Sequence, residues 1–300
     1  MNLVRYAIAV SVLLATSAAA VAAESSAAPA EPPQGAAAAT TAQESTQPVF
    51  VKPKDYRKEP FQRMVILGES TVEGGPWLVS STQRYADIVA GLIGLCQGAP
   101  IEYYNKGIGA NAISTRSPGY ADSRKPSAME RYKDDVIAKK PDLFLLCYGL
   151  NDMRAGMPIA DFREDMATII RDVKAACDPV IVLTTVYYMT GWKSYPPYDK
   201  GSVEITQQYN ECIRGLAAEF DCIVADVWSA EGGADWVIDP DGVHANRVGN
   251  LLIAHRIFEA IAQHASCLTI KNFEDLSDSK WRKETTGKRA SVGDPFQKTW

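Results

Sequence analysis

Short apolar runs alternate with longer amphipathic segments between about residue 60 and residue 265 of this 300-residue chain. The run 143–148 (LFLLCY) contains no charged residue, which is typical of a strand buried on both faces of a sheet. Alternation of such strands with helical segments predicts an α/β fold, in which helices cover both faces of a parallel sheet. The expected strands are 64–67, 101–104, 143–148, 180–183 and 222–225, and the expected helices are 77–95, 159–176, 203–219 and 246–265.

The two ends of the chain differ in composition from this central part. Arg5 precedes an apolar stretch over 6–15, and small residues end at Val21-Ala22-Ala23, so residues 1–23 are predicted to be a signal peptide. The apolar stretch is shorter than the roughly 20 residues that a membrane span needs. We therefore expect an exported protein, periplasmic or secreted, with no stable membrane insertion after cleavage.

Three further segments follow from composition. Residues 24–49 are rich in Ala, Pro, Ser, Thr and Gln and are predicted to be a flexible linker. Residues 50–268 form the expected folded domain, and residues 269–300 form a polar C-terminal tail whose sequence predicts no particular structure.

Charge and metal-binding residues narrow the class of function. The formal net charge is -5, and basic residues are scattered outside the C-terminal tail, which argues against nucleic acid as a partner. The chain has three histidines and no Cys-x-x-Cys pair, so we expect no metal and no cofactor. Its six cysteines leave disulfide pairing open, although Cys147 sits in an apolar run typical of a buried thiol.

Polar residues able to do chemistry follow the ends of the expected strands. Ligands of open parallel sheets bind at the carboxyl ends of the strands, so these residues are expected to share one site. Each segment alone is typical of a turn or a helix cap, but the four together and in this order indicate a catalytic site. They are Gly68-Glu69-Ser70, residues 105–111, Gly149-Leu150-Asn151-Asp152 and residues 239–244.

With these four segments the chain resembles the SGNH hydrolases, also called the GDSL esterase/lipase family, over about residues 62–265. The residues that give that family its name match Ser70, the Gly107–Ala110 loop, Asn151 and His244. The resemblance implies a three-layer α/β/α fold with a flavodoxin-like parallel sheet of about five strands, and a serine hydrolase that cleaves carboxylic esters. The G-x-S-x-G elbow of ordinary α/β-hydrolases is absent.

The resemblance also implies a role for each matching residue. Ser70 would be the nucleophile, His244 its base, and Asp241 the carboxylate that orients the imidazole, with Asp239 as the second candidate for that last role. His255 and His264 fall in the final helix and are expected to be surface or packing residues.

The oxyanion hole implied by the family comprises the N–H of Ser70, the N–H of Gly109 or Ala110, and the side-chain amide of Asn151. Two positions depart from the family pattern. Glu69 replaces the usual Asp, which leaves its role open, and Ala110 occupies a position that is often Gly.

The sequence constrains the identity of the substrate less than it constrains the reaction. Export and the aromatic segment 187–198 favour an acetylated carbohydrate, with Tyr188, Trp192 and Tyr195 as possible sugar contacts, although these rings could equally pack an irregular loop. The alternatives are a lipid-directed esterase, lysophospholipase or thioesterase of the same family, or a catalytically inactive binding module.

Overall fold

We analysed a computed structural model of the chain, in which the structure describes residues 52–268. The expected signal peptide 1–23, the linker 24–49 and the tail 269–300 lie outside the described residues.

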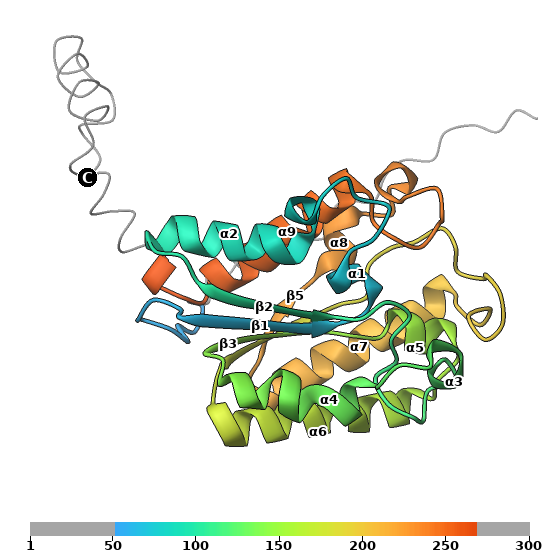
Figure 1. Ribbon diagram of the computed structural model, residues 1–300, viewed down its shortest axis with the longest axis horizontal. Coiled ribbons are helices and arrows are strands. Elements are labelled where there is room, and N and C mark those ends of the chain that lie inside the picture. Colours follow the sequence, from blue (N-terminus) through green and yellow to red (C-terminus); the bar gives the residue numbers. More distant parts are fainter. Residues whose placement is uncertain (1–51, 269–300) are drawn as a thin grey trace, which may run out of the picture. The chain divides into compact units, whose positions relative to one another are not determined.

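The described part contains one parallel sheet of five strands in the order β2-β1-β3-β4-β5 (Figure 1). This is the flavodoxin-like order, which confirms the predicted fold class. Gly68, the last residue of β1, is paired with Gly107 on one side and with Cys147 on the other, so three strands end at one level. The strands are β1 (Arg63–Gly68), β2 (Glu102–Gly107), β3 (Leu143–Cys147), β4 (Val180–Thr184) and β5 (Ile223–Ala225).

Helices cover both faces of the sheet (Figure 1). One layer consists of α2 (Tyr85–Gln97), α8 (Val227–Glu231) and α9 (Arg247–Ala262), and the other of α4 (Ala128–Asp135), α6 (Ile159–Cys177) and α7 (Val203–Phe220). Short helices follow the strand ends or lie in the connections: α1 (Ser70–Glu73), α3 (Tyr120–Ser123) and α5 (Leu150–Arg154), with 3-10 turns at Ser81–Gln83, Ile137–Lys139 and Asp235–Val237.

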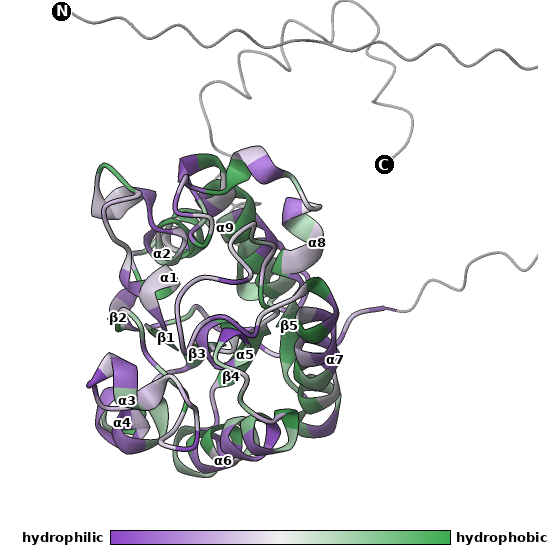
Figure 2. Cartoon of the chain, turned by 90° about the vertical axis from the view of Figure 1, so that its right-hand side faces the viewer, coloured by the Kyte–Doolittle hydropathy of each residue, from purple (hydrophilic) through white to green (hydrophobic). Residues whose placement is uncertain are grey.

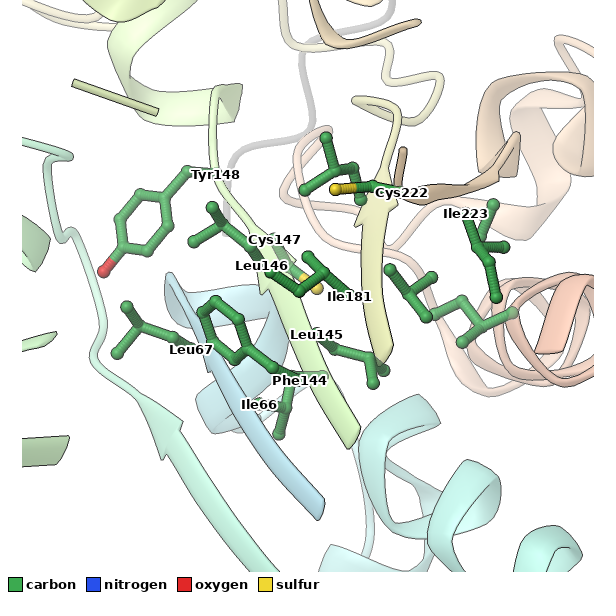
Figure 3. Close-up of a cluster of buried hydrophobic side chains, with 14 of the residues drawn as sticks. Ile66, Leu67, Phe144, Leu145, Leu146, Cys147, Tyr148, Ile181, Cys222 and Ile223 are labelled. Carbon is green, nitrogen blue, oxygen red and sulfur yellow. The ribbon is translucent and has the colours of Figure 1, made fainter. Parts of the chain in front are cut away.

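The central strand, β3, and its neighbour β1 supply much of the middle of the hydrophobic core. Ile66 and Leu67 of β1 and Phe144, Leu145 and Leu146 of β3 are fully buried (Figure 3). Because helices pack on both faces, neighbouring side chains of these strands all enter apolar surroundings, which explains the unbroken apolar run in the sequence.

The helix expected over 77–95 is shorter than predicted. It begins at Tyr85, and residues 77–84 form a loop that contains the Ser81–Gln83 turn. The reason is a tertiary contact, because the indole of Trp77 stacks on the ring of His244 instead of joining the helix.

Helix α4 was not predicted, although its start carries a local signal. Ser127 and Glu130 form a reciprocal capping box, in which Glu130 accepts hydrogen bonds from the backbone N–H and the hydroxyl of Ser127.

All six cysteines lie in the described part of the chain and carry free thiols. Cys147 is buried in β3, as its apolar surroundings predicted. None of the helices in residues 52–268 is long and apolar enough to span a membrane.

Candidate active site

Ser70 is the first residue of α1, directly beyond the end of β1, and its side chain is largely buried. A Cβ at Gly68 would lie 2.3 Å from Val72 and 2.8 Å from the carbonyl oxygen of Cys147, so only glycine lets α1 turn this tightly over the strand ends. Figure 2 shows α1 and α5 in front of the strands, between the two helical layers. The chain therefore sets Ser70 at the carboxyl edge of the sheet, where α/β folds bind their ligands.

Ser70, His244 and Asp241 form a continuous chain of contacts. Ser70 Oγ lies 2.8 Å from His244 Nε2, and His244 Nδ1 lies 2.6 Å from Asp241 Oδ2. The other carboxylate oxygen, Asp241 Oδ1, accepts hydrogen bonds from the backbone N–H groups of Val243 and His244, at 2.8 and 2.9 Å. Asp241 is thus fixed by its own loop and orients the imidazole toward the serine.

Burial lowers the pKa of His244 below its usual value of 6.5, although the hydrogen bond and the charge of Asp241 oppose this change. Burial pushes the pKa of Asp241 upward, but hydrogen bonds from His244 and Val243 outweigh it and hold this pKa below its usual value. At neutral pH the imidazole is therefore neutral and able to accept a proton.

Asp239, the second candidate for the orienting carboxylate, has another position. Its backbone N–H donates to the carbonyl oxygen of His244 at 2.7 Å, and its Oδ1 accepts from the N–H of Asp241 at 3.3 Å. Its carboxylate therefore supports the loop and does not bond to the imidazole. The other histidines lie elsewhere: His255 is exposed on α9, and His264 Nδ1 lies 2.7 Å from the carbonyl oxygen of Lys54.

Trp77 contacts the imidazole from one face, a contact that the sequence interpretation missed. The two rings are stacked, with centroids 3.6 Å apart and an angle of 6° between their planes. The indole shields one side of the ring and can stabilise the imidazolium that a proton transfer creates.

Glu69 holds the loop that carries Asn151. Its side chain accepts hydrogen bonds from the backbone N–H groups of Gly149 at 2.8 Å, Leu150 at 3.1 Å and Asn151 at 3.0 Å. Burial and then the nearby Asp152 raise the pKa of Glu69 to about 8, against the effect of these three bonds. The longer Glu at this position thus ties β1 to the start of α5.

The Asn151 side chain faces the same cleft as Ser70. Its Nδ2 donates to the carbonyl oxygen of Asn111 at 3.1 Å, which leaves its second N–H for another acceptor. The Asn111 side chain is itself fixed, because its Oδ1 accepts from Tyr148 Oη at 2.6 Å and from Arg131 Nη2 at 3.2 Å. Buried Arg131 was not singled out from the sequence, and it orders the surroundings of Asn151.

Gly109 and Ala110 lie in the loop after β2 and also face the cleft. Ala110 has a φ of +55°, a left-handed conformation that favours glycine, which accounts for the glycine usual at this position in the family. A Cβ at Gly109 would lie 2.7 Å from Glu73 Oε2, and the Gly109 carbonyl accepts from Lys125 Nζ at 2.7 Å. None of the hydrogen bonds formed within residues 52–268 engages the backbone N–H of Ser70, Gly109 or Ala110.

These residues line one open cleft with a volume of about 420 Å³. Of the three predicted sugar contacts, Tyr195 lines it and is 59% exposed. Tyr188 and Trp192 do not line it, because they pack edge-on against each other and both contact Trp228. Tyr198 and Arg154 line the cleft and were not singled out from the sequence.

A parallel α/β sheet with a Ser-His-Asp chain at its carboxyl edge defines a class of serine hydrolase. The sequence matches the GDSL-like Lipase/Acylhydrolase family over residues 66–252, and the chain belongs to that family. This confirms the resemblance seen in the sequence and identifies the protein as a carboxylic ester hydrolase. In residues 52–268, no group of three or more His, Cys, Asp or Glu side chains is placed to hold a metal ion.

Known proteins similar to this chain fall in the same family. An acetylxylan esterase from Geobacillus stearothermophilus is 21% identical over 222 residues, which cover 67% of this chain and 94% of that protein. The crystal structure of a lipase/acylhydrolase from Enterococcus faecalis is 21% identical, with a TM-score of 0.53, and covers 67% of this chain and 95% of its own. A structure of a variant of the Geobacillus acetyl xylan esterase is 20% identical, with a TM-score of 0.51, and covers 71% of this chain and 98% of its own. These structures share the fold of this chain.

Proposed function

We propose that this protein is an exported esterase that removes small acyl groups, chiefly acetyl, from a carbohydrate by a Ser-His-Asp mechanism. The observation that carries the proposal is the line from Ser70 Oγ through the imidazole of His244 to Asp241, at 2.8 and 2.6 Å, which faces an open cleft. Each distance is that of a hydrogen bond, so the chain is assembled before substrate arrives.

The proposed reaction has two halves. Ser70 Oγ attacks the ester carbonyl carbon while its proton moves to His244 Nε2, and the imidazolium is stabilised by Asp241 and by the face of Trp77. The tetrahedral intermediate collapses by breaking the bond to the alcohol oxygen, which takes the proton from His244. Water then attacks the acyl-enzyme in the same way, releasing the acid and restoring Ser70.

The oxyanion that forms in each half is assigned to three donors. These are the backbone N–H of Ser70, the backbone N–H of Ala110 and the free N–H of the Asn151 amide. The left-handed φ of Ala110 supports its choice over Gly109, because it marks Ala110 as the position that the family usually fills with glycine.

The lining of the cleft supports a small acyl group. Of the described residues that line it, none is Leu, Ile, Met or Phe, so a long acyl chain would find no apolar slot. The ring of Tyr195, which is 59% exposed, offers an apolar face and a polar edge that suit a sugar. Similarity to an acetylxylan esterase points to the same kind of substrate. The signal-peptide pattern of residues 1–23 supports export, which would bring extracellular polysaccharides within reach.

Hydrolysis of p-nitrophenyl acetate, butyrate and octanoate, followed by acetate release from an acetylated oligosaccharide, tests this proposal. We expect kcat/KM to fall as the acyl chain lengthens, because nothing in the cleft buries the added methylenes. Faster turnover of octanoate would favour a lipid-directed enzyme or thioesterase. No turnover of any ester, together with binding of the sugar, would indicate an inactive binding module.

A further inference from the structure

Arg154 is a buried cation in the wall of the cleft. Arg154 is only 5% exposed. In the described part of the chain, no carboxylate lies within 4 Å of its guanidinium. Its Nε is enclosed without a hydrogen-bond partner, and none of the hydrogen bonds described for residues 52–268 uses its terminal nitrogens. A buried charge without a partner costs free energy of folding, and such a group is typical of a binding site.

The fold holds this side chain in place. Arg154 follows Asn151 by three residues on α5, so the two side chains lie on the same side of that helix. The guanidinium carbon lies 5.6 Å from the centre of the Tyr198 ring, in cation–π contact. A Cβ at Gly201 would lie 3.2 Å from Arg154 Cγ and 2.4 Å from the Trp192 carbonyl oxygen, so only glycine permits this packing.

In the described part of the chain, none of the carboxylates near the cleft forms an ion pair with Arg154. Asp241 bonds to His244. The charge of Glu69 favours the charged form of Arg154, but the Glu69 carboxylate accepts three backbone N–H groups and forms no ion pair with the guanidinium. Glu73 also lines the cleft, and its carboxylate lies beside Gly109. Although burial lowers the pKa of Arg154, an arginine stays charged in proteins. The positive charge of Arg154 is therefore available to a ligand.

We propose that Arg154 binds a carboxylate on the substrate, so that the preferred substrate is an acyl ester of an acidic sugar of the uronic acid class. The planar guanidinium matches a carboxylate through two parallel hydrogen bonds. We assign the carboxylate to the sugar because Arg154 contacts Tyr198, and Tyr198 packs edge-on against Tyr195, the exposed ring assigned to the sugar. A single cation with Glu73 and Asp241 in the same lining suits one negative charge better than a doubly charged phosphate. The inference rests on the proposed esterase function and narrows its substrate class.

Two matched substrates test the inference: an acetylated methyl glucuronoside with a free carboxylate, and the same compound as its neutral methyl uronate. For the wild type we expect kcat/KM about 10–100-fold higher on the acid, with the difference mainly in KM, because a charged hydrogen-bonded contact supplies binding of this size. Arg154→Met should bring the ratio close to one, and Arg154→Lys should give an intermediate ratio. Lys193→Met, which removes the same charge from an exposed residue outside the cleft, should keep the wild-type ratio.

Other outcomes would overturn the inference. A wild-type ratio near one would do so, and so would an equal loss on both substrates in Arg154→Met, since a charge acting at the reacting ester would not tell them apart. Thermal unfolding supplies a second readout, because loss of an unpaired buried cation should keep or raise the Tm of Arg154→Met, whereas a structural role would lower it.

A measurement on the wild type alone tests the inference even if Arg154→Met fails to fold. Methyl glucuronoside, without any acyl group, should inhibit p-nitrophenyl acetate hydrolysis about tenfold more strongly than methyl glucoside, and equal inhibition would contradict the inference. Ser70-dependent hydrolysis of p-nitrophenyl acetate without acid preference would refute the inference and leave the proposed function standing. If no ester is hydrolysed, the proposed function fails, and thermal shifts with the two sugars still test whether the site binds the carboxylate.

Discussion

The substitution Asp241→Asn tests how the structure prepares His244 as a base. Asp241 Oδ1 accepts from two backbone N–H groups, so the carbonyl oxygen of an asparagine must occupy that side. Its NH₂ group would then face His244 Nδ1, which could only accept, and the imidazole proton would move to Nε2. That nitrogen lies 2.8 Å from Ser70 Oγ, where it would donate a proton and could no longer take one.

The wrong tautomer should lower kcat about 10⁴-fold, as the same change does in other triad enzymes, which corresponds to about 5 kcal/mol of transition-state stabilisation. A second effect concerns pH. Activity requires neutral His244, and burial already lowers its pKa, so the wild-type kcat/KM should fall only below about pH 6.5. Because Asp241 raises this pKa, Asp241→Asn should move the residual acid limb to still lower pH.

The assay is hydrolysis of p-nitrophenyl acetate from pH 5 to pH 8, with Asp239→Asn as the matched control from the same loop. We expect the control to stay within a few-fold of the wild type, because its carboxylate does not bond to the imidazole. If Asp241→Asn kept activity within tenfold of the wild type, or if Asp239→Asn lost as much as Asp241→Asn, Asp241 would not be the residue that orients His244.

Three further predictions concern the surroundings of the triad. Asn151→Ala should lower kcat about 10²–10³-fold, with an unchanged far-UV spectrum, because it removes one oxyanion donor; activity within a few-fold would sink that assignment. Burial raises the pKa of Glu69 from 4.5 to about 8, so its stabilising contribution is complete below about pH 4.5 and is lost as pH rises to about 8. Urea unfolding should therefore show stability falling over this window. Glu69→Gln should reduce this fall but not abolish it, because burial also raises the pKa of the neighbouring Asp152. Phe144→Ala should lower the free energy of unfolding by about 3–5 kcal/mol, since its side chain is fully buried in β3, and a loss below 1 kcal/mol would contradict this packing.

Much of the fold could be predicted because it depends on patterns that are local in sequence. A strand such as 143–148 must be apolar on both faces to lie inside a covered sheet, and that property is visible in the letters alone. The position of the site could be predicted because the carboxyl ends of parallel strands lie at the same edge of a sheet. The pairing of Gly68 with Gly107 and Cys147 shows this for three of the strands.

The features that could not be predicted depend on partners far away in the sequence. Trp77 leaves the helical pattern because it stacks on His244, which lies 167 residues further along the chain. Arg131 and Arg154 resemble surface residues in the sequence, yet both are buried by segments that the fold brings to them. The placement of Tyr195 in the cleft, with Tyr188 and Trp192 outside it, depends on how an irregular loop packs, and periodicity carries no information about that.

Glu69 combines a feature that the sequence reveals with a role that only the structure reveals. The sequence showed that a Glu replaces the usual Asp, but it could not show what the longer side chain reaches. The structure shows that it reaches three backbone N–H groups at the start of α5 and so fixes the loop that carries Asn151.

Covalent labelling shows whether Ser70 is a nucleophile already activated by His244. The wild type, treated with a fluorophosphonate and analysed by mass spectrometry, should carry one adduct, located on Ser70. Ser70→Ala should take up no label and should lose about 10⁶-fold in kcat on p-nitrophenyl acetate. An unlabelled wild type, or label and turnover that persist in Ser70→Ala, would show that Ser70 is not the activated nucleophile.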